Sequence, residues 1–245
     1  MQTQSSVLLL GDTHGDPQSL ADAFARAYAE RVEAIIQLGD YGFGWSVGDD
    51  GVCDYSYLTN EMVKKSGIPF YFVDGNHENF DRLYELPLNE AGHRPVLEGV
   101  THLPRGSVIK FGETTFMAFG GAYSVDKPHR VEGKSWWKDE LASQEDIDRA
   151  LSAGKADILL THDAPWGTQT EGDFVWLEKT FDNDAVVLSQ ANQQLINRVL
   201  ESCGAKKVFH GHLHRNYTRT ISGTDIEATC LNKETSEGSI IILPV

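Results

Sequence analysis

Apolar residues in the first third of the chain gather in short runs, and a polar, glycine-containing loop follows each run directly. Three runs share this pattern: 7–10 before 11–16, 34–38 before 39–42, and 69–73 before 74–78. Each run has the length of a buried β-strand. Between the runs, apolar positions at helical spacing predict one helix from Pro17 and another over about 55–65. Strands that alternate with helices in this way are typical of layered α/β folds.

The rest of the chain adds more strands, and in places the helical rhythm stops. β-like runs over 99–103, 108–111 and 114–119 predict hairpins, with a turn at 112–113. Further strands are expected at 157–160, 207–209, 217–221, 225–230 and 239–243. Helices are expected over 144–152 and 188–203, whereas 43–53, 121–140 and 163–183 are predicted to be loops. Since the sequence contains no repeat, low-complexity tract or linker, we expect one domain over residues 1–245.

Composition narrows the class of protein. The chain is 40% hydrophobic and 23% charged, as globular domains are. No apolar run approaches the roughly 20 residues of a membrane span, and residues 1–6 do not resemble a signal peptide, so we expect a cytoplasmic protein that binds no membrane. Three scattered cysteines argue against a disulfide framework or a thiolate zinc site. A net charge of −15 disfavours duplex DNA but permits small phosphorylated substrates, because bound divalent cations reverse the local charge.

Residues that bind hard or borderline metal ions recur at the ends of the predicted strands. They are Asp12 and His14, Asp40, Asn76 and His77, His162, and His212 and His214. Parallel strands bring their carboxyl ends to one edge of a sheet, so we expect these side chains to converge. Imidazole, carboxylate and amide groups without thiolates suit Mn²⁺, Fe or Zn²⁺. Eight residues exceed the needs of one ion, and a carboxylate such as Asp40 can bridge two ions that activate water for attack on phosphorus.

Five short motifs, in this order, resemble the calcineurin-like metallophosphoesterase superfamily: Gly-Asp-Thr-His-Gly (11–15), Gly-Asp-Tyr-Gly (39–42), Gly-Asn-His-Glu (75–78), Thr-His-Asp (161–163) and Gly-His-Leu-His (211–214). The resemblance implies an α/β fold, a four-layer αββα sandwich with two facing mixed β-sheets. It implies that Asp12, His14, Asp40 and His214 hold one metal ion, and that Asp40, Asn76, His162 and His212 hold another. The cofactors would be two divalent metal ions, Mn²⁺ first, with Fe, Zn²⁺ or Ni²⁺ as alternatives. A hydroxide that bridges the ions would attack phosphorus, and His77 would protonate the leaving oxygen as general acid.

The sequence departs at one place from part of that superfamily. The Ser/Thr protein phosphatases carry an Asp-Arg pair three and four positions after the bridging aspartate, where this chain has Phe43 and Gly44. Because a dianionic monoester has most need of the missing guanidinium, we expect phosphodiester substrates. Arg82 and Arg130 are candidate substrate-binding residues that would supply the charge from another direction.

Two other functions stay open at this stage. The motif at 75–78 also permits a phosphomonoesterase, including Ser/Thr protein phosphatase-like activity, and a non-catalytic binding scaffold would be expected to lack some of the ligands that are present here. The substrate would be a phosphorylated small molecule, a nucleotide or a single-stranded nucleic acid, while the oligomeric state stays open. Trp136 and Trp137 would either stack on a nucleobase or pin their loop to the core. His210 is expected to support the site or the core rather than bind metal.

Overall fold

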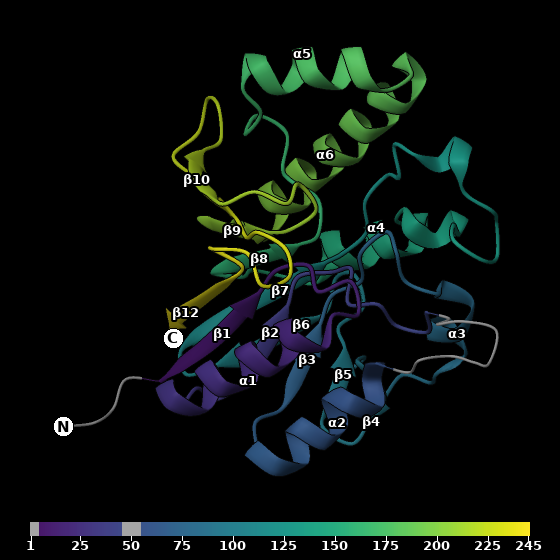
Figure 1. The fold of residues 1–245 in the computed structure, drawn as a ribbon. Helices are drawn as coiled ribbons and strands as arrows, with labels where there is room; N and C mark the ends of the chain where they lie inside the picture. Colours follow the sequence, from purple (N-terminus) through teal and green to yellow (C-terminus); the bar gives the residue numbers. More distant parts are fainter. Residues whose placement is uncertain (1–4, 46–54) are drawn as a thin grey trace.

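The computed structural model describes residues 5–45 and 55–245, which form a layered α/β arrangement (Figure 1). The helices are α1 (Pro17–Glu30), α2 (Tyr55–Ser66), α3 (Phe80–Glu85), α4 (Gln144–Ser152), α5 (Glu171–Thr180) and α6 (Asn183–Cys203), with short 3₁₀ helices at Lys127–His129 and Lys138–Glu140. The strands are β1 (Ser6–Leu10), β2 (Ile35–Gln37), β3 (Phe70–Phe72), β4 (Arg94–Leu97), β5 (Val100–His102), β6 (Val108–Phe111), β7 (Thr114–Phe119), β8 (Ile158–Thr161), β9 (Lys207–His210), β10 (Tyr217–Thr220), β11 (Glu227–Cys230) and β12 (Ile240–Pro244).

These strands form two six-stranded sheets. The first has the order β12-β1-β2-β3-β5-β4, with parallel pairing from β1 to β5 and antiparallel strands at both edges. The second has the order β10-β11-β9-β8-β7-β6, with parallel pairing from β11 to β7 and again antiparallel edges. Both sheets are therefore mixed, as the family resemblance implied.

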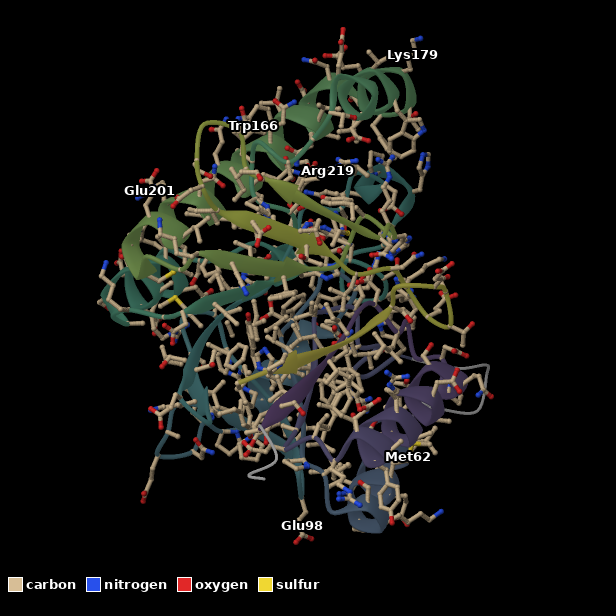
Figure 2. All side chains as sticks on the ribbon, turned by 90° about the vertical axis from the view of Figure 1, so that its left-hand side faces the viewer. Met62, Glu98, Trp166, Lys179, Glu201 and Arg219 are labelled. Atoms are coloured by element: carbon tan, nitrogen blue, oxygen red, sulfur yellow. The ribbon has the colours of Figure 1, made fainter. Side chains whose placement is uncertain are left out.

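Alternating side chains along the strands divide the core into layers. In β1, Leu8 and Leu10 pack with α1, whereas Val7 and Leu9 pack against the second sheet. β8 repeats the pattern from the other side, since Leu160 faces the first sheet and Leu159 packs with α4 and α6. Figure 2 shows the side chains filling the space between the halves, with Met62 and Glu98 near one end of the molecule and Lys179 near the other. The order of layers is helix, sheet, sheet, helix, which confirms the four-layer αββα sandwich.

One expectation from the sequence is wrong. Residues 163–183 were predicted to be a loop, but helix α5 lies within them. Among the side chains that the structure describes in this helix none is buried, and Val175 and Trp176 are exposed, so they give the sequence no helical apolar period. The available signal was instead a capping box, in which Thr170 and Asp173 satisfy each other's backbone N–H groups.

Two further segments differ in detail from the prediction. The half-exposed edge strand β4 was not anticipated, because a short edge strand leaves little apolar alternation. Residues 121–124, at the start of the predicted loop 121–140, are buried. The predicted loop at 43–53 falls largely outside the described residues.

Among the helices in the described ranges, none combines the length and the hydropathy that crossing a bilayer requires.

Candidate metal centre and cleft

The candidate site lies where loops from both sheets meet. β1, β2 and β3 lead into the loops that carry Asp12 and His14, Asp40, and Asn76 and His77, while β8 and β9 lead into those that carry His162, His212 and His214. Short distances connect the two sheets. His162 Nε2 lies 3.4 Å from Asp40 Oδ1, and His214 Nε2 lies 3.1 Å from Asp12 Oδ2. The structure thus brings residues 200 positions apart into one cluster.

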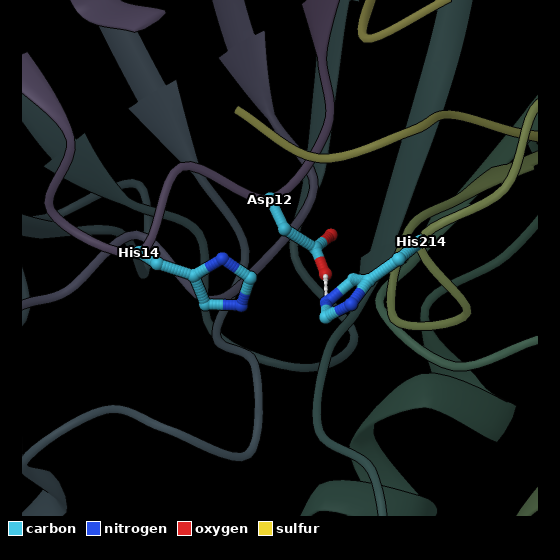
Figure 3. Close-up of side chains that lie close together, drawn as sticks. All are labelled: Asp12, His14 and His214. Atoms are coloured by element: carbon cyan, nitrogen blue, oxygen red, sulfur yellow. Dashed lines mark ion pairs between the residues drawn. The ribbon is translucent and has the colours of Figure 1, made fainter. Parts of the chain in front are cut away.

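One group of potential ligands consists of Asp12, His14 and His214 (Figure 3). One ligand atom from each lies within 4.8 Å of the others. Asp12 is fully buried, and its two oxygens also accept the backbone N–H of His212 at 3.1 Å. His14 turns Nε2 toward Asp40 Oδ2 at 3.4 Å. The nitrogen and oxygen donors around this small volume suit a divalent cation.

A second group consists of Asp12, Asp40 and His162, all buried. Asp40 uses its two oxygens in different directions, because Oδ2 faces His14 and Oδ1 faces His162 Nε2. Asn76 joins this group, since its Oδ1 lies 3.1 Å from His162 Nε2. Each oxygen of Asp40 can therefore serve a different cation.

His162 has the hydrogen bonding of a metal-binding histidine. Its Nδ1 lies 2.8 Å from Leu38 O, and because a carbonyl only accepts, Nδ1 carries the proton and Nε2 is left to bind. Burial of the ring opposes a positive charge on His162. The carboxylates of Asp40 and Asp12 outweigh this effect and raise the pKa of His162 to about 10. The same two carboxylates would favour a divalent cation beside Nε2.

Asn76 is oriented by a chain of buried hydrogen bonds. Its Nδ2 donates to Ser124 Oγ at 2.9 Å, and Ser124 donates to Glu140 Oε2 at 2.5 Å. The amide oxygen must then face His162 and Asp40. With the His162 ring neutral and protonated at Nδ1, three acceptor atoms point at one another here, an arrangement that fits a cation between them. Ser124 and Glu140 were not identified from the sequence, because their contact with Asn76 depends on packing between distant segments.

Several residues of the cluster have the left-handed backbone conformation that non-glycine residues seldom adopt. The φ angle is 46° at His14, 53° at Asp40, 63° at His212 and 50° at His214. Such strain costs on the order of 1–3 kcal/mol per residue and persists mainly at functional sites. Gly75 permits the tight packing, because a Cβ there would collide with the Asp40 carboxylate.

Glu78 supports the loop that follows Asp40. It is fully buried, and its carboxylate accepts the backbone N–H groups of Tyr41, Gly42 and Phe43 at 2.8–3.2 Å. Burial, with a further contribution from the charge of Asp40, raises the pKa of Glu78 to about 7. The buried carboxylate of Glu78 thus fixes the backbone of this loop. The ring of Phe43 packs in the core and does not face the substrate side.

His77 lies at the edge of the cluster beside a guanidinium group. Its Nε2 is 3.9 Å from Asp40 Oδ2 and 3.2 Å from Arg130 Nη2. Burial lowers the pKa of His77, and while the charge of Asp40 opposes this shift, that of Arg130 adds to it. Arg130 is itself held by Asp126, which accepts from Nε and Nη2 at 2.7 Å.

A cleft of about 820 Å³ opens beside His14, His77 and His214. Its other lining residues include cationic and aromatic side chains: Trp45, Arg130, Lys134, Trp137 and Lys233. Three cationic side chains therefore border the cleft although the chain carries −15 overall, and two of them, Arg130 and Lys233, form ion pairs with Asp126 and Glu234. Arg82, by contrast, is exposed and is not among the described residues that line this cleft.

The remaining candidates lie in supporting positions. Trp137 donates from Nε1 to Asp81 at 2.9 Å and is almost fully buried, while Lys127 lies 4.0 Å from the ring centre of Trp136. His210 is buried against the hydroxyl of Tyr217, and burial lowers its pKa to about 4. A neutral, buried His210 agrees with a supporting role.

Comparison with known proteins places the chain among phosphoesterases. Residues 5–216 match the family model described as "Calcineurin-like phosphoesterase". The lariat debranching enzyme of Schizosaccharomyces pombe is 29% identical over 189 residues, which cover 71% of this chain and 40% of that enzyme. This chain therefore matches about two fifths of the length of the yeast enzyme. A UDP-2,3-diacylglucosamine hydrolase of Stenotrophomonas maltophilia is 24% identical over 222 residues, covering 86% of this chain and 82% of that enzyme.

Solved structures show the same fold at low identity. A dimetal phosphatase from Danio rerio aligns with a TM-score of 0.52 and 12% identity, covering 94% of this chain and 87% of that one. The protein TT1561 of Thermus thermophilus aligns with a TM-score of 0.53 and 11% identity, covering 94% and 90%. At these identities the likeness concerns the fold alone.

Proposed function

The chain belongs to the calcineurin-like phosphoesterase family and is a metal-dependent phosphoester hydrolase, and from this premise we propose that it is a two-metal phosphodiesterase. The observation that carries the proposal is the position of Asp40, whose two oxygens face two different groups of ligand atoms. Asp12, His14, Asp40 and His214 would hold one divalent ion. Asp40, Asn76, His162 and His212 would hold the other. Mn²⁺ is the proposed metal, with Fe, Zn²⁺ or Ni²⁺ as alternatives, because the donors are nitrogen and oxygen.

When bound, two such ions supply an activated water and neutralise negative charge on the phosphoryl group. The residues of the chain orient the metal ligands and supply the proton. Asn76 and His162 reach the second ion in fixed orientations, since Ser124 and Leu38 occupy their other polar atoms. His77 would donate a proton to the leaving oxygen, and an anionic phosphate bound beside the ring would favour the protonated form that this task requires.

Arg130 supports a preference for diesters. It is the cation beside His77, but Asp126 already neutralises it through two hydrogen bonds, and its Nη1 donates to Ser135 O at 3.2 Å. A monoester dianion needs one more compensating charge than a diester monoanion. Phe43 and Gly44, at the positions of the absent Asp-Arg pair, do not supply that charge, and Phe43 is packed into the core.

The proposed substrate class is a phosphorylated small molecule, a nucleotide or a single-stranded nucleic acid. The cationic and aromatic lining of the cleft would suit a phosphate group joined to a flat ring. Relatives named for lariat debranching and for a UDP-linked sugar agree with a nucleotide-containing ester.

The test compares bis-p-nitrophenyl phosphate with p-nitrophenyl phosphate, using protein purified without chelator and supplied with Mn²⁺. We expect turnover of the diester to exceed that of the monoester, and we expect Asp40→Asn to abolish it. Glu237→Ala, an exposed substitution in the tail, serves as the control and should leave the rate unchanged. Protein that stays inert with Mn²⁺, Fe²⁺ and Zn²⁺ alike would contradict the proposal.

A phosphomonoesterase is the second candidate, and the position of the Arg130 guanidinium beside His77, rather than its neutralised charge, is the observation that favours it. Its Nη2 lies 3.2 Å from His77 Nε2, close enough to share a phosphate with that ring. Turnover of the monoester alone would select this candidate over the diesterase. Release of phosphate from phosphopeptides would then indicate a protein phosphatase, and release from nucleoside monophosphates would indicate a small-molecule phosphomonoesterase.

A further inference from the structure

Glu234 contacts the metal cluster from the tail of the chain. It lies in the loop between β11 and β12, beyond the residues 5–216 that match the family model. Its Oε1 is 3.2 Å from Nδ1 of His14. Like His14 itself, Glu234 has a left-handed backbone, with a φ angle of 51°. A strained residue that places a carboxylate on a candidate ligand is unlike an ordinary surface glutamate.

The loop around Glu234 is built onto the first metal-binding loop. The backbone N–H of Glu234 donates to Asp12 O at 2.6 Å. Gly11 permits this packing, because a Cβ there would collide with the carbonyl oxygen of Asn232. β12, which follows the loop, pairs with β1 along its whole length, from Ser6 to Leu10. The position of Glu234 is therefore fixed relative to His14 by backbone contacts.

We propose that Glu234 is a positioning residue for His14. The carboxylate accepts a hydrogen bond from Nδ1–H of His14, which leaves the lone pair on Nε2. That atom points at Asp40 Oδ2, 3.4 Å away, where one of the two divalent ions is proposed to bind. Carboxylates that hold metal-binding histidines in this way fix the tautomer and the ring orientation. Lys233 Nζ lies 3.5 Å from the same Oε1.

The inference rests on the proposed function, since it assigns Glu234 to one ion of that centre. The experiment measures Mn²⁺ binding to the full chain by isothermal titration and counts the sites. Glu234→Ala should weaken one of two sites by about 10- to 100-fold and leave the other unchanged. Glu234→Gln keeps an acceptor oxygen and should retain most of the affinity. Glu237→Ala, in the same loop, is the matched control and should bind as the wild type does.

A spectroscopic measurement reports on orientation directly. In the Zn²⁺-loaded protein, ¹H–¹⁵N correlation should show His14 protonated at Nδ1, and Glu234→Ala should lose or shift this signal while the other histidines keep theirs. If Glu234→Ala does not fold, Glu234→Asp, which withdraws the carboxylate by one methylene, takes its place with the same expectation.

The outcomes separate this inference from the function on which it rests. A wild-type chain that binds fewer than two Mn²⁺ ions contradicts the two-metal proposal itself. A wild type with two sites, together with a Glu234→Ala variant of unchanged affinity, overturns the role of Glu234 alone. Equal losses in Glu234→Ala and Glu237→Ala would also overturn it, because they would trace the effect to the loop rather than to the carboxylate.

Discussion

Asp40 occupies the centre of the site, and its surroundings leave it little freedom. Its backbone is left-handed, its Oδ1 accepts the N–H of His77 at 3.0 Å, and Glu78 holds the residues that follow it. Burial raises its pKa, but the nearby His162 and His77 charges more than reverse this, so the pKa of Asp40 lies well below its usual range. The carboxylate is thus ionised and preorganised to bind cations.

His77→Ala tests the proton donor. We expect kcat for diester hydrolysis to fall by about 10²- to 10⁴-fold, with Mn²⁺ stoichiometry unchanged, because the ring lies 3.9 Å from Asp40 and is not among the proposed ligands. The loss should be large for an alkyl leaving group and small for p-nitrophenolate, which departs without a proton. Measurement of kcat for both substrates checks this, and equal losses would rule out a role in protonating the leaving group.

Some residues of the site could be predicted from the sequence and others could not. Asp12, His14, His162 and His214 follow within a few residues of apolar runs, and parallel strands place such positions at one edge of the sheet. Glu234 reaches His14 from 220 positions away, through the pairing of β12 with β1. No local sequence pattern indicates this contact, because it depends on the pairing of the edge strand β12 with β1.

At the scale of elements, the end of β3 is anchored by a buried ion pair. Arg105 donates to Asp74 Oδ2 from Nε at 2.8 Å and from Nη2 at 2.6 Å. His102 approaches the other oxygen, Oδ1, at 3.1 Å. Burial opposes the charge, but Arg105 and His102 lower the pKa of Asp74 below its usual range. This pair fixes the point from which the loop carrying Asn76 departs.

Arg105→Ala should lower the free energy of unfolding by about 3–5 kcal/mol, because it leaves a buried carboxylate unpaired. In the wild type the pKa of Asp74 is depressed, so its contribution is present above the unfolded value of about 3.9 and is lost as pH falls below it. The deficit of the variant should therefore be fully present at pH 7 and smaller near pH 3, below that value. Urea unfolding at both pH values measures it.

Arg149→Ala is the control for this prediction, since Arg149 belongs to the same cluster but its side chain is 37% exposed. Its loss should be about 1 kcal/mol or less. An Arg105→Ala variant no less stable than Arg149→Ala would show that the buried pair does not anchor β3.

Elements with one buried face were predictable and those without were not. α1 and α6 bury apolar residues at helical spacing, and their positions follow from that period. α5 has no buried side chain among those that the structure describes and was not predicted, although Thr170 and Asp173 form a capping box at its start. An amphipathic pattern predicts that a helix packs against a core. A helix with little core packing therefore has a weak apolar period in its sequence.

At the scale of the whole molecule, the proposed metal centre joins the two sheets. Asp12, Asp40 and Asn76 come from the first sheet, whereas His162, His212 and His214 come from the second. Cations bound among them would link the halves, and ligands that bind only the folded state stabilise it. The layered order itself was predictable from the motifs, while the cationic cleft was not, because its lining comes from separated loops.

Crystals grown with Mn²⁺, with diffraction recorded at the manganese absorption edge, test the central claim most directly. The account predicts two anomalous peaks roughly 3.5–4 Å apart, one beside His14 and His214 and the other beside Asn76 and His162, with Asp40 between them. A single peak, or peaks away from Asp40, would contradict it.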